Sequence, residues 1–210
     1  MGQRGPTNVY VDAFNLYYGC LRGTPYKWLD LGALCARLLP QDPIHRIRYF
    51  TARVSARSDP NTPQRQQTYI RALETIPILT VHYGHFLTNT VTMPVAKRKP
   101  LGPKFVQVTK TEEKGSDVNL ASLLLLDAFR QDCSTAVVIS NDSDLKLPIE
   151  LAQKELGIRV GVVNPHVAKA RSKALTPTFF KQIRSSAITA SQFPDVLHDS
   201  KGAIHKPRNW

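Results

Sequence analysis

The chain has 210 residues, 42% of them hydrophobic, which is enough to form the core of one sizeable α/β domain but leaves little room for two. Lys and Arg number 28 against 16 Asp and Glu, and the resulting net charge of +12 favours association with polyanions. Three dispersed cysteines exclude a disulfide framework and a cysteine zinc site, while the lack of a membrane span or signal peptide predicts a cytoplasmic protein that contacts no membrane.

The predicted elements alternate between strands and helices. In chain order they are a strand over 8–12, a helix over 30–39, a strand over 44–52, a helix over 63–74, a strand over 79–83, a helix from near Asp117 to Phe129, a strand over 135–140, a helix over 148–156 and a strand over 159–163. Residues 176–186 favour one more helix, and the apolar circumference of the helix that ends at Phe129 predicts a well-buried crossover. This alternation predicts a mostly parallel, doubly wound sheet with helices on both faces.

Residues 85–115 interrupt the alternation. Short β-like pieces flank the basic, proline-rich stretch 95–104, which predicts a loop or loose hairpin inserted into the domain. Its cations are candidates for phosphate contacts: Lys97, Arg98, Lys99 and Lys104. If this charge is merely solvated, the candidates become Arg53, Arg57 and Arg65, or Lys169, Arg171 and Lys173. The domain is placed over residues 1–187, with the insertion at about 85–115, and residues 188–210 are interpreted as a C-terminal tail.

Aspartates follow two of the predicted strands. Asp12 ends the first strand, Asp142 and Asp144 follow the strand over 135–140, and Asp117 begins a helix. Taken singly, each is better explained as a helix cap or turn residue. Together, they are expected to converge at the carboxyl edge of the sheet, where crowded carboxylates repel one another unless a cation is present. Mg²⁺ or Mn²⁺ takes oxygen ligands and can activate water for attack on phosphorus.

Three motifs, in this order, resemble those of NYN domains, which are PIN-like nucleases. Residues 11–17 resemble the first motif, which commonly reads Asp-Gly-Phe-Asn, while 114–118 resemble the second and 139–145 the third. The match runs from about residue 8 to 165, and the end of the chain, with Lys206, Pro207 and Trp210, resembles stand-alone bacterial members. Ala13 and Asn141 stand where the family has glycine, and Leu145 stands where an aromatic residue is common, but all four acidic positions are intact.

The resemblance implies a PIN-like three-layer α/β/α fold, with the first and fourth parallel strands adjacent and an acidic pocket at their carboxyl ends. It implies a divalent-metal-dependent endoribonuclease, a hydrolase of single-stranded or structured RNA. Mg²⁺ or Mn²⁺ would be held by Asp12, Asp117, Asp142 and Asp144, with Asn15 assisting catalysis. The expected RNA contacts are Lys97, Arg98, Lys99, Lys104, Lys114 and Asn141.

Other functions fit the same residues. A flap or single-strand DNA nuclease would use the same site, because no residue visibly reads a 2′-hydroxyl. A catalytically inactive RNA-binding or interaction protein of the same fold is also open, as is assembly into a homodimer. A phosphotransferase of the haloacid dehalogenase kind is excluded because Phe14 stands where its second aspartate is required. Dinucleotide binding is excluded because no Gly-x-Gly-x-x-Gly follows a strand.

Overall fold

The fold is built around one seven-stranded sheet. The computed structural model describes residues 5–56 and 59–208, so Arg57 and Trp210, named above, lie outside the described residues. The strands are β1 (Thr7–Asp12), β2 (Ile44–Ala52), β3 (Leu79–Pro94), β4 (Phe105–Lys114), β5 (Thr135–Ile139), β6 (Arg159–Asn164), β7 (Phe179–Gln182), β8 (Val196–Asp199) and β9 (Gly202–His205). The helices are α1 (Ala13–Leu16), η1 (Tyr17–Leu21), α2 (Leu31–Leu38), α3 (Thr62–Leu73), α4 (Ser116–Phe129), η2 (Ser143–Leu145), α5 (Lys146–Lys154), η3 (Ala168–Ala170) and α6 (Ser185–Thr189).

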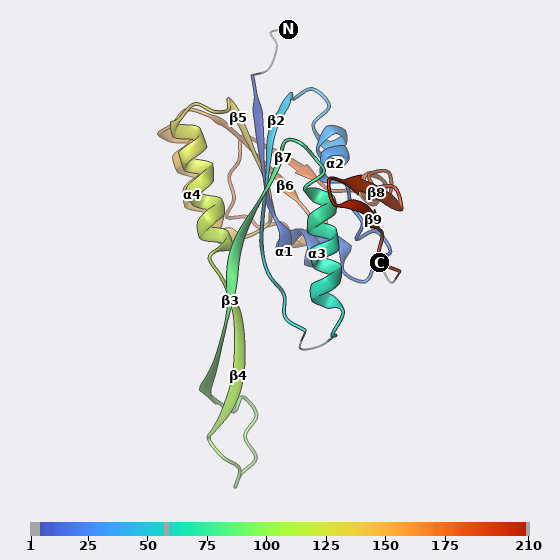
Figure 1. Cartoon of the computed structure of the whole chain (residues 1–210). Helices are drawn as coiled ribbons and strands as arrows, with labels where there is room; N and C mark the ends of the chain where they lie inside the picture. Colours follow the sequence, from blue (N-terminus) through green and yellow to red (C-terminus); the bar gives the residue numbers. More distant parts are fainter. Residues whose placement is uncertain (1–4, 57–58, 209–210) are drawn as a thin grey trace.

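The strand order of the sheet is β4-β3-β2-β1-β5-β6-β7, and all of these strands except β4 run parallel. Helices α2 and α3 cover one face of the sheet, and α4 covers the other (Figure 1). This confirms the predicted three-layer α/β/α fold. Because β1 lies beside β5, the fourth of the parallel strands, the chain order reverses between them, and ligands of open α/β sheets bind at such a point.

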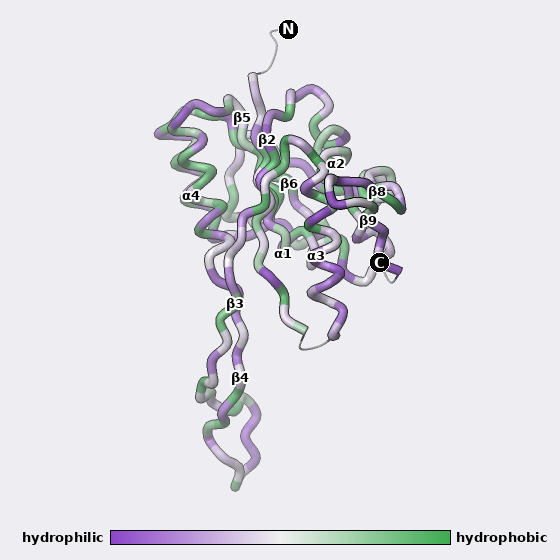
Figure 2. Tube along the Cα trace, in the orientation of Figure 1, coloured by the Kyte–Doolittle hydropathy of each residue, from purple (hydrophilic) through white to green (hydrophobic). Residues whose placement is uncertain are grey.

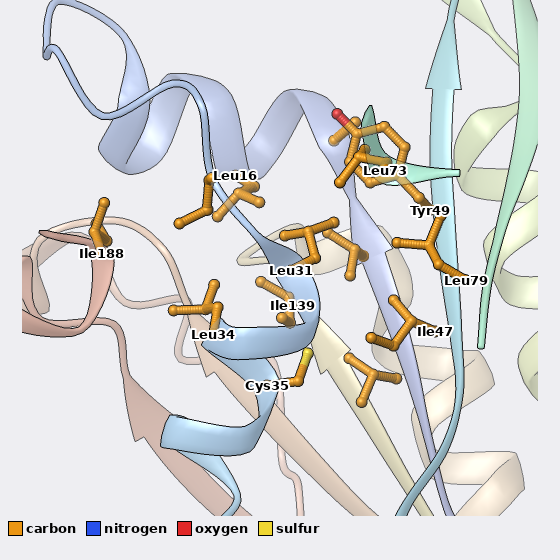
Figure 3. Packing of buried hydrophobic residues seen from close by; sticks show 14 of the residues in the cluster. Leu16, Leu31, Leu34, Cys35, Ile47, Tyr49, Leu73, Leu79, Ile139 and Ile188 are labelled. Carbon is orange, nitrogen blue, oxygen red and sulfur yellow. The ribbon is translucent and has the colours of Figure 1, made fainter. Parts of the chain in front are cut away.

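The side-chain period of the strands explains how one sheet serves two cores. Val9 and Val11 of β1 belong to the core under α2 and α3, whereas Tyr10 belongs to the core under α4 and α5. Figure 3 shows side chains of the first core, among them Leu34 of α2 and the sheet residues Ile47 and Ile139. Every residue of β1 is buried, as expected for the central strand of a parallel sheet.

Residues 85–115 form a regular hairpin. The third strand begins at Leu79 as predicted, but it continues beyond Tyr83 to Pro94. β3 continues past the sheet and pairs with β4 from His85↔Lys114 to Pro94↔Phe105. Threonine and valine occur throughout the ladder, and the hydroxyls of Thr88 and Thr111 lie 2.9 Å apart across it. The hairpin projects from the body at the edge where α1 begins (Figure 1), and hydrophilic and hydrophobic residues are interspersed up to its tip (Figure 2).

The C-terminal part of the chain differs from its sequence interpretation. Residues 176–186 form β7 and the start of α6 rather than one helix, because Phe179 and Phe180 pair with β6 as edge-strand residues. After Ala187 the chain packs against the domain. Phe193 is buried against Trp28, with ring centroids 5.7 Å apart, and the β8–β9 hairpin is joined to α3 by the ion pair of Asp199 with Arg71.

Helix α4 is attached to the sheet by a buried polar cluster. Asp127, which is 2% exposed, accepts two hydrogen bonds of 2.7 Å from the guanidinium of Arg48 and one of 2.8 Å from the hydroxyl of Tyr10. The outer side of α4 is open, since Phe129 is 73% exposed, and the prediction of a well-buried helix is therefore wrong on that side. Within the described ranges, neither α4 nor any other helix is long and apolar enough to cross a membrane.

We expect Asp127→Ala to lower the free energy of unfolding by about 3–5 kcal/mol, because Arg48 would stay buried without its carboxylate. Urea denaturation measures this change. The control is Glu150→Ala, which removes a helical ion pair with the exposed Lys154 at 3.6 Å and should cost less than about 1 kcal/mol. Equal losses in the two variants would contradict the anchoring role of Asp127.

Candidate active site at the carboxyl edge of the sheet

An acidic cleft of about 210 Å³ lies where β1 and β5 end. It is lined by Asp12, Phe14, Asn15, Tyr18, Glu113, Ser116, Asp117, Asp142 and His166. The structure thus brings together Asp12, Asn15, Asp117 and Asp142 of the predicted site. Asp144 is exposed and does not line the cleft.

Asp12 joins the ends of the two central strands. The Oδ1 atom of Asp12 accepts a hydrogen bond of 2.9 Å from the amide of Asn15, and Asp12 thereby caps α1. Its Oδ2 atom accepts a hydrogen bond of 3.0 Å from the hydroxyl of Ser140, which directly follows β5. Asp12 is 5% exposed, and this burial raises the pKa of its carboxyl, while the two hydrogen bonds oppose that rise. Asp12 is therefore both a helix cap and a cleft carboxylate.

Asp142 also combines a local and a cleft role. Its Oδ1 accepts a hydrogen bond of 2.9 Å from the amide of Asp144 and caps η2. The amide of Asp142 donates to the hydroxyl of Ser140 at 3.1 Å, so the same serine positions Asp12 and Asp142. The loop does not require the glycine of the family motif, because Gln131 is the single non-glycine residue with positive φ in the described part of the chain. Leu145 fills the core at 1% exposure.

Asp117 enters the cleft from the first turn of α4. The turn before it requires Gly115, which has φ of +95°, and the chain crosses β3 at Gly84, where a β-carbon would lie 2.4 Å from Oε1 of Glu113. Glu113 accepts hydrogen bonds from the amide and the hydroxyl of Ser116, at 3.0 and 2.6 Å. Sequence reasoning missed Glu113 as a cleft residue, although it directly adjoins the second motif.

The carboxylates of the cleft act on one another. Burial first, and then the charges of Asp12, Asp142, Glu113 and Asp144, raise the pKa of Asp117 from 3.8 to about 6. The carboxylate of Asp117 accepts no hydrogen bond from the residues that the structure describes, so none of them offsets this repulsion in that way. A cation in the cleft would offset it.

Asn15 links the cleft to a histidine that sequence reasoning missed. Its Oδ1 accepts a hydrogen bond of 2.9 Å from the amide of Asn141 and lies 3.0 Å from Nε2 of His166. Because an amide oxygen only accepts hydrogen bonds, the donor in this contact is the Nε2–H group of His166. The signal in the sequence was the position of His166 just past the strand predicted over 159–163, at the same edge as the aspartates.

The donor chemistry of the cleft fits a hard divalent ion. Asp12, Asp117 and Asp142 offer carboxylate oxygens, which are the ligands that Mg²⁺ and Mn²⁺ prefer, and the unpartnered, repelled carboxylate of Asp117 lacks a counter-charge. Over residues 5–56 and 59–208, however, no three His, Cys, Asp or Glu side chains form a ready-made metal site. Binding of an ion would therefore require these side chains to draw closer.

The predicted RNA-contact residues lie in three places. Lys97, Arg98, Lys99 and Lys104 are exposed at the hairpin tip, away from the cleft, and Lys114 at the hairpin base pairs with Glu112 at 3.5 Å. Asn141 holds a second basic segment at the cleft rim. Its side chain donates to the carbonyl of Ala170 and accepts from the amide of Ser172, both at 2.7 Å, and this segment carries Lys169, Arg171 and Lys173.

We expect Asp117→Asn to raise the melting temperature in EDTA at pH 7, because it removes the ionised carboxylate that the cleft repels. For a chain of this size, each 1 kcal/mol raises the midpoint by roughly 2–4 °C. The folded protein holds the Asp117 proton more tightly than the unfolded chain, so its stability falls as the pH rises from 3.8 to about 6, and the advantage of the variant should appear over that window.

Thermal melts of wild type, Asp117→Asn and Asp144→Asn between pH 3.5 and 7.5 measure this effect. Asp144→Asn is the control because Asp144 lies outside the cleft and should change the midpoint less. Mg²⁺ or Mn²⁺ should stabilise the wild type more than Asp117→Asn. Identical curves for wild type and Asp117→Asn at every pH would show that the carboxylate is not under repulsion.

Comparisons with known proteins agree with this fold. The chain is 31% identical to the 6-hydroxy-3-succinoylpyridine 3-monooxygenase HspA of Pseudomonas putida (strain S16), over 97% of this chain and 75% of that protein. It is similar in fold to a protein of unknown function from Vibrio parahaemolyticus RIMD 2210633, with a TM-score of 0.55 and 20% identity over 88% of this chain and 96% of that structure. A model of the NYN domain, a nuclease-type domain, matches residues 6–186. Because this match spans most of the chain and all three motifs, the protein belongs to the NYN domain family.

Proposed function

We propose that this protein is a divalent-metal-dependent endoribonuclease that hydrolyses phosphodiester bonds in the acidic cleft. The observation that carries the proposal is the convergence of Asp12, Asp117 and Asp142 on one cleft, where mutual repulsion and burial raise the pKa of Asp117 to about 6. Structural caps do not need to face one another in this way. Membership of a nuclease-type family supports the same conclusion.

In this proposal the three cleft aspartates hold Mg²⁺ or Mn²⁺, with Asp144 contributing from the rim. The bound ion supplies an activated water and neutralises charge that develops on the phosphate. Water loses a proton as its oxygen adds to phosphorus, the bond to the leaving oxygen breaks, and the leaving oxygen takes up a proton. Asn15 accepts the hydrogen bond of the Nε2–H group of His166 and so fixes the orientation of this imidazole at the cleft.

RNA is the proposed substrate, and single-strand or flap DNA is the alternative with the same site. The net charge of +12 supports a polyanionic substrate in either case. The exposed cations of the hairpin tip are proposed to contact the strand at a distance from the cleft, since β3 and β4 carry them beyond the sheet edge.

Oxygenation of a small aromatic compound is a second candidate. It is favoured by the similarity to HspA, whose name describes a monooxygenase, along 97% of this chain. Oxygen consumption by the purified protein with 6-hydroxy-3-succinoylpyridine, measured with and without NADH or NADPH as electron donor, tests it. Turnover in this assay with no cleavage of RNA or DNA would replace the nuclease proposal.

We expect Asp12→Asn and Asp142→Asn each to abolish RNA cleavage while RNA binding is largely retained, because the variants remove carboxylate charge from the cleft but leave the basic surface intact. Labelled RNA and DNA of matched sequence are incubated with each protein in Mg²⁺, Mn²⁺ or EDTA. Asp195→Asn, at an exposed position far along the chain, is the control and should cleave like the wild type.

Cleavage by both cleft variants, or by the wild type in EDTA, would refute the assignment. Purified wild type and variants prepared in parallel also control for a contaminating nuclease, whose activity would not follow the substitution. Preference for the DNA strand over the RNA strand would replace the ribonuclease with its DNA-directed alternative.

We expect RNA binding to weaken steeply with salt, and replacement of Lys97, Arg98, Lys99 and Lys104 by alanine to flatten this dependence. On a single strand, each neutralised phosphate contributes roughly 0.7 to the slope of log affinity against log salt. Fluorescence anisotropy in EDTA at several salt concentrations measures the slope. Lys169→Ala/Lys173→Ala is the comparison, and a slope changed by this pair alone would place the contacts at the cleft rim.

A further inference from the structure

An aromatic cavity of about 420 Å³ adjoins the acidic cleft. It lies between α1–η1, the end of β2 and the first turns of α3, and its aromatic walls are Phe14, Tyr17, Tyr18, Tyr49 and Tyr69. Phe14 and Tyr18 also line the acidic cleft, so the two spaces share a wall. A molecule in this cavity would therefore lie directly beside any phosphate held in the cleft.

Two polar groups of the cavity, the hydroxyl of Tyr49 and the ammonium of Lys27, have no partner among the residues that the structure describes. Tyr49 is more than nine-tenths buried, at 8% exposure, and its hydroxyl makes no hydrogen bond with the described residues. The ammonium of Lys27, half-buried in the same wall, likewise has no ion pair among them. In contrast, the hydroxyl of Tyr69 donates to the carbonyl of Leu29 at 2.8 Å.

Three further polar side chains of the wall, Asp59, Arg65 and Gln66, are engaged. Arg65 pairs with Asp59, and the amide of Gln66 donates to the carbonyl of Ala52 at 2.8 Å and accepts from the amide of Val54 at 2.9 Å. The cavity therefore offers flat aromatic walls and donors, among them the Tyr49 hydroxyl and the Lys27 ammonium, and its carboxylate, Asp59, is paired. This combination suits a planar ring with a hydrogen-bond acceptor on its edge, and the volume lies within the range of small-ligand pockets, about 300–1,000 Å³.

We propose that this cavity binds one unpaired nucleobase of an RNA strand whose backbone passes through the acidic cleft. This proposal rests on the ribonuclease function proposed above and adds the class of substrate. A base that enters the cavity must leave its stack and its pairing partner, so the enzyme selects single-stranded RNA or unpaired loops. The aromatic walls stack on the base, and the hydroxyl of Tyr49 donates to its edge.

Tyr17 is the residue that tests the proposal, because it is 37% exposed and its loss leaves the core intact. Tyr83, which is 38% exposed and stacks under Arg53 outside the cavity, is a matched control. Anisotropy of labelled oligouridylate in EDTA gives the affinity without cleavage. Tyr17→Ala should weaken binding about five- to a hundredfold, as expected for loss of one base–aromatic stack, while Tyr17→Phe and Tyr83→Ala should stay within about twofold of the wild type.

The second arm uses the same oligomer with stable abasic spacers in place of all bases. Wild type and Tyr17→Ala should bind this backbone equally, because no base remains to stack. An equal loss on both oligomers would show that Tyr17 contacts the backbone, and would overturn the proposal. A loss no larger than that of Tyr83→Ala, or no binding of RNA by the wild type, would overturn it as well.

Two further measurements distinguish the base subsite from binding of a free aromatic acid and from the nuclease proposal itself. Binding of pyridine-3-carboxylate that depends on Tyr17, with RNA affinity independent of it, would assign the cavity to a free aromatic acid and overturn the base subsite. Cleavage assays in Mg²⁺ test the nuclease itself: cleavage without dependence on Tyr17 overturns only the base subsite. Tyr17-dependent binding of base-bearing RNA without cleavage supports the subsite and refutes only the nuclease.

Discussion

The contact of Arg48 with Asp127 determines where the acidic cleft can form. It attaches the last turns of α4 to β2, and the hydroxyl of Tyr10 attaches the same carboxylate to β1. From Asp127 back to Asp117 the helix spans about 15 Å, which carries its first turn to the edge where β1 ends in Asp12. The buried pair of Arg48 and Asp127 at the far end of α4 thus fixes the position of this helix along the sheet, and with it the position of Asp117 relative to Asp12.

The cleft is negative in a protein whose net charge is +12. The field of the whole surface attracts a polyanion, whereas the cleft itself repels a phosphate as long as Asp12, Asp117 and Asp142 are ionised. For the polyanionic substrate proposed above, approach to the surface and final positioning in the cleft would therefore respond to different charges. A cation is the group that reconciles them, because it lowers the repulsion among the carboxylates and provides a positive contact for phosphate oxygens.

Much of the fold could be predicted from local sequence patterns. β2 has the predicted bounds, Asp30 caps α2, and the strands of the parallel sheet alternate with helices as their apolar periods indicate. For residues 85–115 only a loop or loose hairpin was predicted. The two strands face solvent on both sides and are stabilised by pairing with each other. The hydrophobic pattern of a single strand does not report this long-range pairing. β7 was missed for the same reason, as its pairing with β6 outweighs its local preference.

The convergence of the aspartates could be predicted because a parallel sheet gathers the residues that follow its strands. The anchor Asp127 could not, since it acts through contacts distant in sequence. Glu113 and His166 did carry a signal, because Glu113 adjoins the second motif and His166 follows a predicted strand. Asp127 in particular sits in a run of leucines, and only the packing of α4 on Arg48 shows that it is buried and paired. For a charged residue inside an apolar helix, the sequence does not distinguish a buried ion pair from a surface position, because both give the same local pattern.

Phe14 is the place where the separate parts of the site meet. It follows Asp12 by two residues, its ring packs edge to face on Phe86 of β3 with centroids 5.8 Å apart, and it forms part of the wall between the cleft and the aromatic cavity. Phe86 pairs with Glu113, so the base of the hairpin, the acidic cleft and the cavity are connected through one side chain. In the proposed complex, a strand held along the hairpin would reach Phe14, where its backbone would follow the cleft and one of its bases would enter the cavity.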